Sequence, residues 1–504
     1  MFVHSIRVLY LTHGFFYFPK GSENGKIQFS EEIMNNTKKK GFTMPNNYVV
    51  IFAIILLAAV MTYIIPAGMY DRVENADGRL VVVDGSFHYV DQTPVSPFGI
   101  FEAISTGFTE VADIMFFIIF AYGWISVLLN NGTFNAMIGG LIRKFGDKIE
   151  YMIPVIMIFF GVLGSTMGMS EETYGLIPAF VGIAIALGYD AFVGTCMTYV
   201  AASTGFASAT LNPFTIGVAM SVAEVEYPYG LPYRIFIFAV FEIIVISYVW
   251  RYARKIKADP TKSLLYGTKL NMAQGVATKE ELMNARMNGR HKMCIAVFLI
   301  TIFFLVFGTL QWGWYINELS ALFLIAMIVS GAVGGMNANE IAQNFVMAAK
   351  DMMFGAMVVG LSRGIVVVLN QGNIIDTIIH ALSMPLLSLG NIMGSLSQYI
   401  SAMGMVVVQN LVNFFIGSGS GQASAVMPIM APLADMIGVS RQTAVLAFQF
   451  GDGYSNMFWP NGIFLISGLM GAPAGKWFKF VAPLFGIMFV FQLIFICGAV
   501  AIGF

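Results

Sequence analysis

The chain has 504 residues, of which 57% are hydrophobic and only 11% are charged. Soluble domains have about 25% charged residues, so this composition excludes an ordinary soluble protein. Apolar runs of about 20 residues recur along the chain, as expected for membrane-spanning helices, whereas the short alternating segments of a membrane β-barrel are absent. We therefore predict an all-α membrane protein with many spans.

Residues 1–43 form an N-terminal tail before the first apolar run. Residues 1–33 lack the order of charge, apolar core and small-residue cleavage site of a signal peptide. Met34 opens the stretch MNNTKKKGFTMPNNYVV, so we expect residues 1–33 to be a mis-set start or a loose tail. Three consecutive lysines at 38–40 precede the first span, which predicts a cytoplasmic N-terminus by the positive-inside rule.

A first transmembrane repeat is predicted over residues 44–257. The polar stretch from Asp71 to Pro97 resembles a small extracytoplasmic β-hairpin. Residues 149–188 are too broken for a single span and are predicted to form a hairpin with its tip at GSTMGMSEETYG. Residues 191–220 are predicted to form one helix that is interrupted at AASTGFASATLNP.

The predicted linker, residues 258–292, lies in the most basic part of the chain. From Arg251 to Lys292 there are ten Lys and Arg residues against three acidic ones, which predicts a cytoplasmic loop. A second repeat, residues 293–504, is predicted to contain a hairpin at about 391–437 and a broken helix at 441–470, and to end outside the cell.

The two repeats align at an offset of 250, which places Pro178 on Pro428 and Gly188 on Gly438. The charge pattern puts the mouth of the first hairpin inside and that of the second outside. We therefore predict an inverted-repeat transporter with two re-entrant hairpins and two broken transmembrane helices. Such repeats hold a binding site near the membrane midplane and work by alternating access.

Polar residues at the hairpin tips and helix breaks are the candidates for substrate binding. Irregular backbone at membrane depth is tolerated where it is buried in protein or lines a watery cavity, and carboxylates at that depth are costly. The alternative is that the carboxylates are solvated or cap a helix, Asp452 being a candidate N-cap for the second half of its broken helix. The candidates are Ser170, Glu171, Glu172, Thr173, Ser418, Ser420, Gln422, Asp452 and Asn456.

A second set of residues offers neutral oxygens or exposed backbone, which suit a hard cation such as Na⁺. The alternative is Gly/Ser helix packing, which is common in membranes. The histidines and the three cysteines show no metal-ligand spacing, so we expect no cofactor and no metal beyond Na⁺, with Na⁺ or H⁺ as the coupling ion. The ion-binding candidates are Ser165, Thr166, Ser203, Thr204, Gly205, Asn212, Gly451, Gly453 and Ser455.

Arg363 is a further charge inside an apolar run. It could pair with Asp351 or Glu110, or meet a substrate carboxylate, and we favour structural pairing.

Three motifs carry a family resemblance: SEETYGLIPAF, GYDAFVGTCMTYVAASTGFASATLNPFTIGVA and SGSGQASAVMPIMAPLADMIGVSRQTAVLAFQFGDGYSN. The chain from about Met44 onward resembles the YfcC family of the C4-dicarboxylate anaerobic carrier (DcuC-like) group of the ion transporter superfamily. The resemblance implies a bacterial inner-membrane carrier, a homodimer, and a small-molecule substrate that is an amino acid, often a basic one, or a dicarboxylate. It also places the tip and break residues in the site.

We therefore predict a secondary transporter of amino acids, basic ones exchanged or taken up with an ion. The three carboxylates Glu171, Glu172 and Asp452, with no Arg at the tips, favour a cationic substrate. The alternative is a C4-dicarboxylate carrier coupled to Na⁺ or H⁺, since helix N-termini bind carboxylates without arginine. A membrane-embedded enzyme would need a nucleophile–base pair or a metal cluster, which the scattered histidines do not supply, so we do not expect an enzyme. The paired hairpins and the inverted repeat argue against a channel with a continuous pore. Nucleic-acid binding is not expected.

Overall fold

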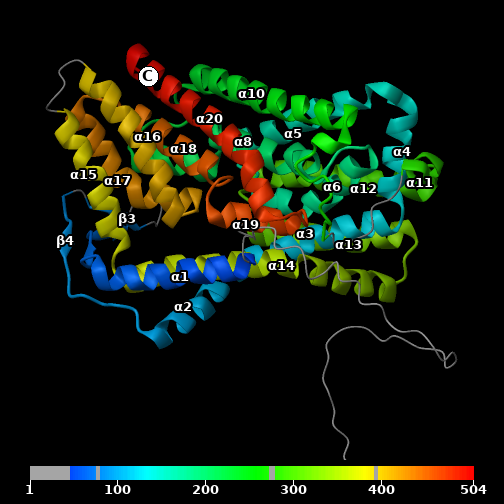
Figure 1. Cartoon of the computed structure of the whole chain (residues 1–504), viewed down its shortest axis with the longest axis horizontal. Helices are drawn as coiled ribbons and strands as arrows, with labels where there is room; N and C mark the ends of the chain where they lie inside the picture. The colour runs from blue at the N-terminus through cyan, green and yellow to red at the C-terminus, as the bar shows by residue number, and fades with distance from the viewer. Residues whose placement is uncertain (1–45, 75–79, 84, 272–278, 391–395) are drawn as a thin grey trace, which may run out of the picture. The chain divides into compact units, whose positions relative to one another are not determined.

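The fold is a bundle of membrane-length helices, which a computed structural model describes for residues 46–74, 80–83, 85–271, 279–390 and 396–504 (Figure 1). Within these residues, eight helical segments are long and apolar enough to cross a membrane. The prediction of a polytopic all-α membrane protein is confirmed; the one about residues 1–33 lies outside the described part of the chain. The eight segments are Asn47–Ile64, Ala112–Asn130, Lys148–Met167, Leu231–Ala258, Gly289–Thr309, Ile316–Gly334, Ala338–Gln371 and Ala474–Ile502.

Among the described residues, the four strands and the two π-helical segments, η4 and η5, lie in the first half of the chain. Its elements are α1 (Asn47–Ile64), β1 (Gly68–Met69), β2 (Arg72–Glu74), β3 (Leu80–Val82), β4 (His88–Tyr89), α2 (Pro97–Glu110), α3 (Ala112–Asn130), α4 (Thr133–Phe145), η2 (Gly146–Tyr151), α5 (Met152–Met167), η3 (Glu171–Leu176), α6 (Ile177–Ala186), α7 (Ala191–Thr195), η4 (Cys196–Val200), α8 (Ala201–Ala207), η5 (Pro213–Gly217), α9 (Val218–Val222) and α10 (Leu231–Ala258).

The second half follows a short connection, η6 (Pro260–Lys262) and α11 (Lys279–Asn284). Its elements are α12 (Gly289–Trp312), α13 (Ile316–Gly334), α14 (Ala338–Gln371), α15 (Ile375–Gly390), α16 (Ser397–Phe415), α17 (Gly419–Ile437), α18 (Arg441–Ser455), α19 (Pro460–Leu469) and α20 (Ala474–Ile502).

Each half contains a helical hairpin followed by a broken helix. In the first half, α5 ends at Gly168 in a left-handed conformation, with φ of 74°, and η3 and α6 form the return arm. In the second half, α16 and α17 are joined by three residues, 416–418. The first arm of each hairpin packs on the broken helix that follows, α5 on α8 and α16 on α18.

The return arms end in the same way at positions 250 residues apart. Gly188 and Gly438 both have positive φ, 81° and 72°, a conformation that glycine adopts without steric cost. Two residues later, the side chains of Asp190 and Ser440 cap α7 and α18. These caps agree with the repeat that the offset predicts; the opposite orientation of the halves in a membrane remains a prediction.

The strands form two antiparallel pairs, β1 with β4 and β2 with β3. The hairpin predicted for Asp71 to Pro97 is therefore only part of the arrangement. β2 and β3 pair within this segment, whereas β4 pairs with β1, which precedes it. The β2 end is held by Arg72, whose guanidinium lies 2.7 Å from the carboxylate of Asp376 on α15. This ion pair anchors the strands to the helical bundle.

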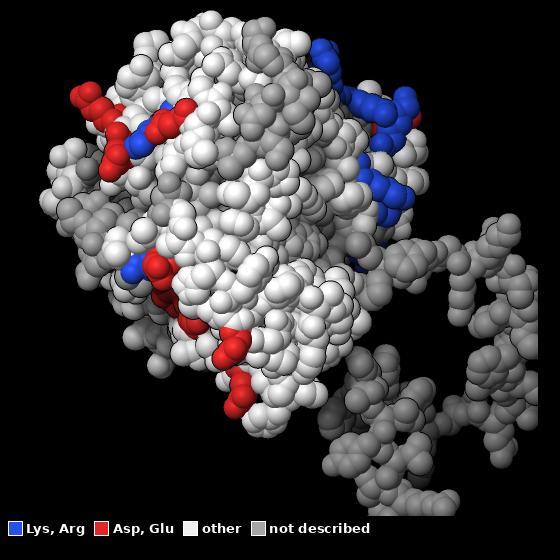
Figure 2. Space-filling model, turned by 90° about the vertical axis from the view of Figure 1, so that its left-hand side faces the viewer, with Lys and Arg blue, Asp and Glu red and all other residues white. Residues whose placement is uncertain are grey.

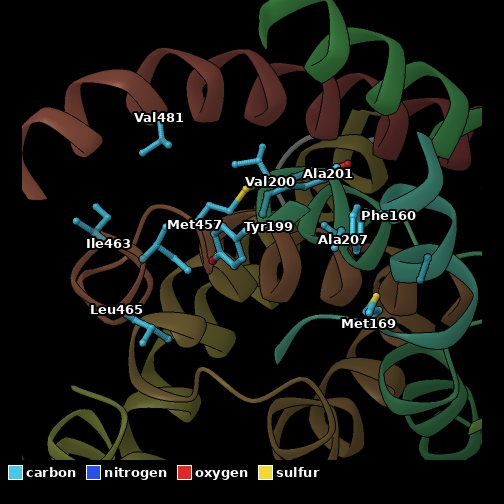
Figure 3. Packing of buried hydrophobic residues seen from close by; sticks show 14 of the residues in the cluster. Phe160, Met169, Tyr199, Val200, Ala201, Ala207, Met457, Ile463, Leu465 and Val481 are labelled. Atoms are coloured by element: carbon cyan, nitrogen blue, oxygen red, sulfur yellow. The ribbon is translucent and has the colours of Figure 1, made fainter. Parts of the chain in front are cut away.

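Helices from both halves build one core. α14 packs on α1, α2 and α3, and α1 runs along α14 in Figure 1. In Figure 3, Tyr199 and Val200 of η4 lie beside Met457, which follows α18. The described chain buries these apolar side chains between the two broken helices, so neither half completes its core alone.

The charged side chains are separated over the surface. Figure 2 shows Lys and Arg gathered on one side and Asp and Glu on the other, with an almost uncharged band between them. Some charged side chains neutralise each other, as Arg441 does with Glu224 and Asp435, at 2.8 Å each. A band of this kind is what contact with lipid tails requires.

Candidate functional site

The tip of the first hairpin is fastened to the first helix break, residues 208–212. Ser165 Oγ lies 3.1 Å from Thr210 Oγ1, and the backbone N–H groups of Thr210 and Leu211 donate to the Ser165 carbonyl at 2.9 and 3.1 Å. A Cβ on Gly168 would lie 2.4 Å from Asn212 Oδ1. The tip and the break therefore form one unit.

Asn212 has a structural role and a free donor. Its Oδ1 accepts from the backbone N–H of Phe214 at 2.9 Å and Thr215 at 3.3 Å, which caps η5. The side chain is fully buried, and its Nδ2 has no hydrogen-bond partner. Thr215 Oγ1 is also buried without a partner. Buried polar groups are rarely left unsatisfied, so these atoms are suited to a ligand.

Asp452 lies inside a continuous helix. α18 runs through Gly451, Asp452 and Gly453 to Ser455, the break is at residues 456–459, and Trp459 is the N-cap of α19. The interpretation of Asp452 as an N-cap for the second half-helix is therefore wrong. The FGDGYSN stretch stays helical because the Asn413 side chain binds the last turn of α18, which offsets the cost of its glycines.

The carboxylate of Asp452 points to the tip of the second hairpin. A Cβ on Gly419 would lie 3.1 Å from Asp452 Oδ2 and 2.7 Å from Thr215 Cγ2. Asp452 is only 1% exposed, and its Oδ1 has no hydrogen-bond partner. The second tip, the first break and the second broken helix thus meet at one carboxylate.

Glu171 and Glu172 begin η3 at the first tip and are partly exposed. Glu172 Oε2 accepts the backbone N–H of Ser170 at 2.9 Å, as the capping interpretation expects. Glu171 stands beside it in the first turn of η3. Thr173, by contrast, donates its Oγ1 hydrogen bond to the Ser170 carbonyl at 2.6 Å.

The candidates at the second tip divide into exposed and buried groups. Ser418 is exposed and caps α17, its Oγ accepting from Gly421 N–H at 3.4 Å. Ser420 is partly exposed in the first turn of α17. Gln422 is fully buried, and its Nε2 donates to Gln409 Oε1 at 2.8 Å, which joins the two arms of the hairpin.

Asn413 of α16 is a site residue that the sequence reasoning missed. Its Nδ2 lies 2.7 Å from the Asp452 carbonyl, 2.5 Å from Ser455 Oγ and 2.9 Å from Asn456 Oδ1. Its Oδ1 is buried without a partner. The only signal in the sequence is an amide inside an apolar helical run, which does not reveal its partners.

Asn456 and Asn413 also line a small pocket between the second hairpin, the second break and helices α1 and α14. Trp459 forms part of its wall, held by a hydrogen bond of 2.8 Å from its Nε1 to the Asn410 carbonyl. The pocket lining is Ile54, Ser362, Ile365, Val366, Asn413, Phe414, Phe415, Gly417, Asn456, Trp459, Pro460 and Gly462.

Three of the candidate ion ligands are glycines at close helix contacts. A Cβ on Gly205 would lie 1.9 Å from the Gly161 carbonyl oxygen. One on Gly451 would lie 2.3 Å from Gln409 Cβ, and one on Gly453 would lie 2.2 Å from Ala207. These positions need glycine for packing, which is the alternative weighed above.

The hydroxyl candidates mostly bond within their own helices. Thr166 donates to the Val162 carbonyl at 2.7 Å, Thr204 to Val200 at 2.7 Å, and Ser455 to Gly451 at 2.5 Å. Ser203 lies in α8, outside the break. No group of three or more His, Cys, Asp and Glu in the described ranges could hold a metal ion.

Arg363 pairs with Glu110, one of its two predicted partners. The guanidinium Nε lies 2.7 Å from Glu110 Oε2, and the pair joins α14 to the end of α2. This pairing is in keeping with the structural role that we favour.

Eight membrane-length spans, two helical hairpins and two broken helices with buried polar groups at their meeting point define a membrane transporter. The chain belongs to the C4-dicarboxylate anaerobic carrier family, whose profile matches residues 44–501. As a member of this transporter family, it works in a lipid bilayer on a small-molecule substrate.

Two curated relatives cover almost the whole chain. The "Putative basic amino acid antiporter YfcC" of Escherichia coli is 29% identical and covers 94% of this chain and 99% of its own. An uncharacterized protein of Haemophilus influenzae is 28% identical and covers 90% of this chain and 96% of its own.

Two solved structures align with most of the chain. The YdaH transporter of Alcanivorax borkumensis has a TM-score of 0.43 and 15% identity, covering 91% of this chain and 99% of its own. The MtrF efflux pump of Neisseria gonorrhoeae has a TM-score of 0.41 and 16% identity, covering 91% and 95%.

Proposed function

We propose that this protein is a secondary transporter that exchanges basic amino acids, or takes them up with an ion, by alternating access. The observation that carries the proposal is the carboxylate of Asp452, which is 1% exposed, lies against Gly419 of the second tip and has an Oδ1 without a hydrogen-bond partner. In the described residues, no ion pair involves Glu171, Glu172 or Asp452. Carboxylates inside a membrane protein need a cation or a proton, and a cationic side chain would supply one.

In this proposal, the substrate lies between the two tips. Its cationic group pairs with Glu171 and Asp452, while its α-carboxylate meets the backbone N–H groups at the start of α17, near Ser418 and Ser420. Asn413 and Asn456 hold the break that lines the site. The relative from Escherichia coli, named as a basic amino acid antiporter, supports the same substrate class.

The remaining oxygen groups near the first break are assigned to the coupling ion. Ser165 lies there, and the hydroxyl of Thr215, which follows the break, is buried without a partner. Na⁺ prefers oxygen ligands of this kind. Movement of one half against the other would open the site in turn to each side, with the basic loop and the N-terminus in the cytoplasm and the C-terminus outside. We also propose a homodimer in the bacterial inner membrane, with linker and repeat boundaries as predicted from the sequence.

A C4-dicarboxylate substrate is the second candidate, favoured by the description of the matched family. The substrate carboxylates would then bind at helix N-termini, and the acidic residues would serve the coupling ion.

Uptake into proteoliposomes distinguishes the two. Liposomes preloaded with ornithine are expected to take up labelled arginine and not succinate, and Asp452→Asn or Glu171→Gln should lower arginine uptake about tenfold or more, since tenfold is about 1.4 kcal/mol of lost interaction. Asp91→Asn and Glu226→Gln, at exposed positions, are the matched controls. Succinate uptake that arginine and ornithine leave unchanged would replace the proposal with the dicarboxylate one.

A further inference from the structure

A buried carboxylate outside the candidate site makes no hydrogen bond and no ion pair in the described residues. Glu242 lies midway along α10 and is 4% exposed. Neither of its carboxyl oxygens has a hydrogen-bond partner, and no ion pair of the described residues includes it. A buried charge without partners is strongly unfavourable, so the carboxyl group needs a proton in this conformation.

The first hairpin forms the wall against this carboxyl group. A Cβ on Gly161 of α5 would lie 2.7 Å from both Cδ and Oε2 of Glu242. The carboxyl group therefore occupies a notch that exists because residue 161 is glycine. The same glycine contacts Gly205 of α8 through its carbonyl oxygen. The notch thus lies where the first hairpin, the first broken helix and α10 meet.

The surroundings contain no cation to balance a negative charge. α5 and α8 have no titratable side chain, and neither has the part of α20 between Phe480 and Phe495 that contacts α10. On α10 itself, Arg234 lies more than two turns away and donates to Gln449 and to the Tyr229 carbonyl.

From α18, Tyr454 is the titratable group that packs on this part of α10, and its phenol carries no charge to balance the carboxylate. Tyr454 stands two residues after Asp452, and its ring centroid lies 4.7 Å from that of Phe241, the neighbour of Glu242. Glu242 is therefore connected to the helix that carries the site's central carboxylate.

We propose that Glu242 is a proton-binding site that couples movement of the first hairpin to proton uptake and release. The proposal rests on the proposed transport function, to which it adds coupling to a proton. The step is a simple protonation: the carboxylate takes one proton when it enters the Gly161 notch, and releases it when water reaches the notch. A proton bound in only one conformation shifts the conformational equilibrium, by linkage.

The first test measures protonation without any substrate. Infrared difference spectra of the purified protein between alkaline and acidic pH should show the carbonyl band of a buried carboxylic acid that is lost in Glu242→Gln. The amide has nearly the same shape and cannot titrate. Unchanged titration bands in the variant would overturn the proposal. If Glu242→Gln does not fold, Glu242→Asp is measured instead. The proposal would be overturned if the carbonyl band of Glu242→Asp had the same position and the same titration midpoint as that of the wild-type protein.

The second test measures coupling in proteoliposomes, with arginine and succinate as the two probes. Whichever probe the wild-type protein takes up, an inward proton gradient should stimulate its uptake, and Glu242→Gln should lose this stimulation while keeping exchange at equal pH. Equal stimulation in both proteins would overturn the proposal. Uptake of succinate in place of arginine would contradict only the proposed substrate, because the response to the proton gradient is read with either probe.

Discussion

Gly453 of α18 and Ala207 of α8 lie so close that a Cβ on the glycine would be 2.2 Å from the alanine Cα. The two broken helices, one from each half, therefore touch backbone to backbone at the level of Asp452. This contact sets the distance between the halves at the candidate site. It also explains why the residue after Asp452 has no side chain.

Gly453→Val is accordingly expected to destabilise the protein. Overfilling a packed interior costs about 1–3 kcal/mol, and here the obstacle is backbone, so the effect should be at the upper end. The measurement is the thermal unfolding midpoint in detergent. Gly486→Ala in α20 is the control, since no atom lies within 4 Å of a Cβ there. Equal midpoints for the two variants would show that the contact is not tight.

Asn413→Ala should weaken both the fold and the site. It removes the donor to the Asp452 carbonyl, Ser455 and Asn456, and buried hydrogen bonds of this kind are worth about 1–3 kcal/mol when one partner is left unsatisfied. The expected result is a lower unfolding midpoint and a smaller thermal shift on adding arginine, because ligand binding stabilises the folded state by mass action. Asn339→Ala at an exposed position of α14 is the control. A normal arginine shift in Asn413→Ala would separate Asn413 from the site.

The ion pair between Arg363 and Glu110 can be tested by a double-mutant cycle with Arg363→Gln and Glu110→Gln. At a water-exposed surface such a pair contributes about 0–1 kcal/mol. Next to lipid, the lower dielectric strengthens it, so we expect a coupling energy above that range. The pair of Arg254 with Glu150, at 4.0 Å and with Arg254 66% exposed, is the comparison and should show almost no coupling. Equal coupling for both pairs would place Arg363 in water.

Asp376 should control how firmly the strands are held. It accepts the Tyr70 backbone N–H at 3.0 Å and pairs with Arg72 at 2.7 Å. Asp376→Ala removes both contacts and should speed proteolytic cleavage in the β1–β4 region, because cleavage follows local opening. Asp91→Asn, at an exposed position, should leave the rate unchanged. An unchanged rate in Asp376→Ala would mean that other contacts hold the strands.

Local sequence chemistry was enough to predict the class of this protein and the order of its main elements. Apolar length predicts the spans, and Gly and polar clusters predict where helices are interrupted, because both are properties of neighbouring residues and of the membrane as solvent. Gly188 and Gly438 both end helices in a left-handed conformation, which favours glycine. Because this requirement is local, the two glycines and their 250-residue offset are visible in the sequence.

The tertiary structure decided what each polar residue does. Whether Asp452 ends a helix or lies within one depends on Asn413, 39 positions earlier, and whether Gly453 serves an ion or a helix contact depends on Ala207. The carboxyl group of Glu242 has room only because residue 161, on another helix, is glycine. Such pairings are set by packing between distant segments, and neither periodicity nor composition encodes which residues will meet.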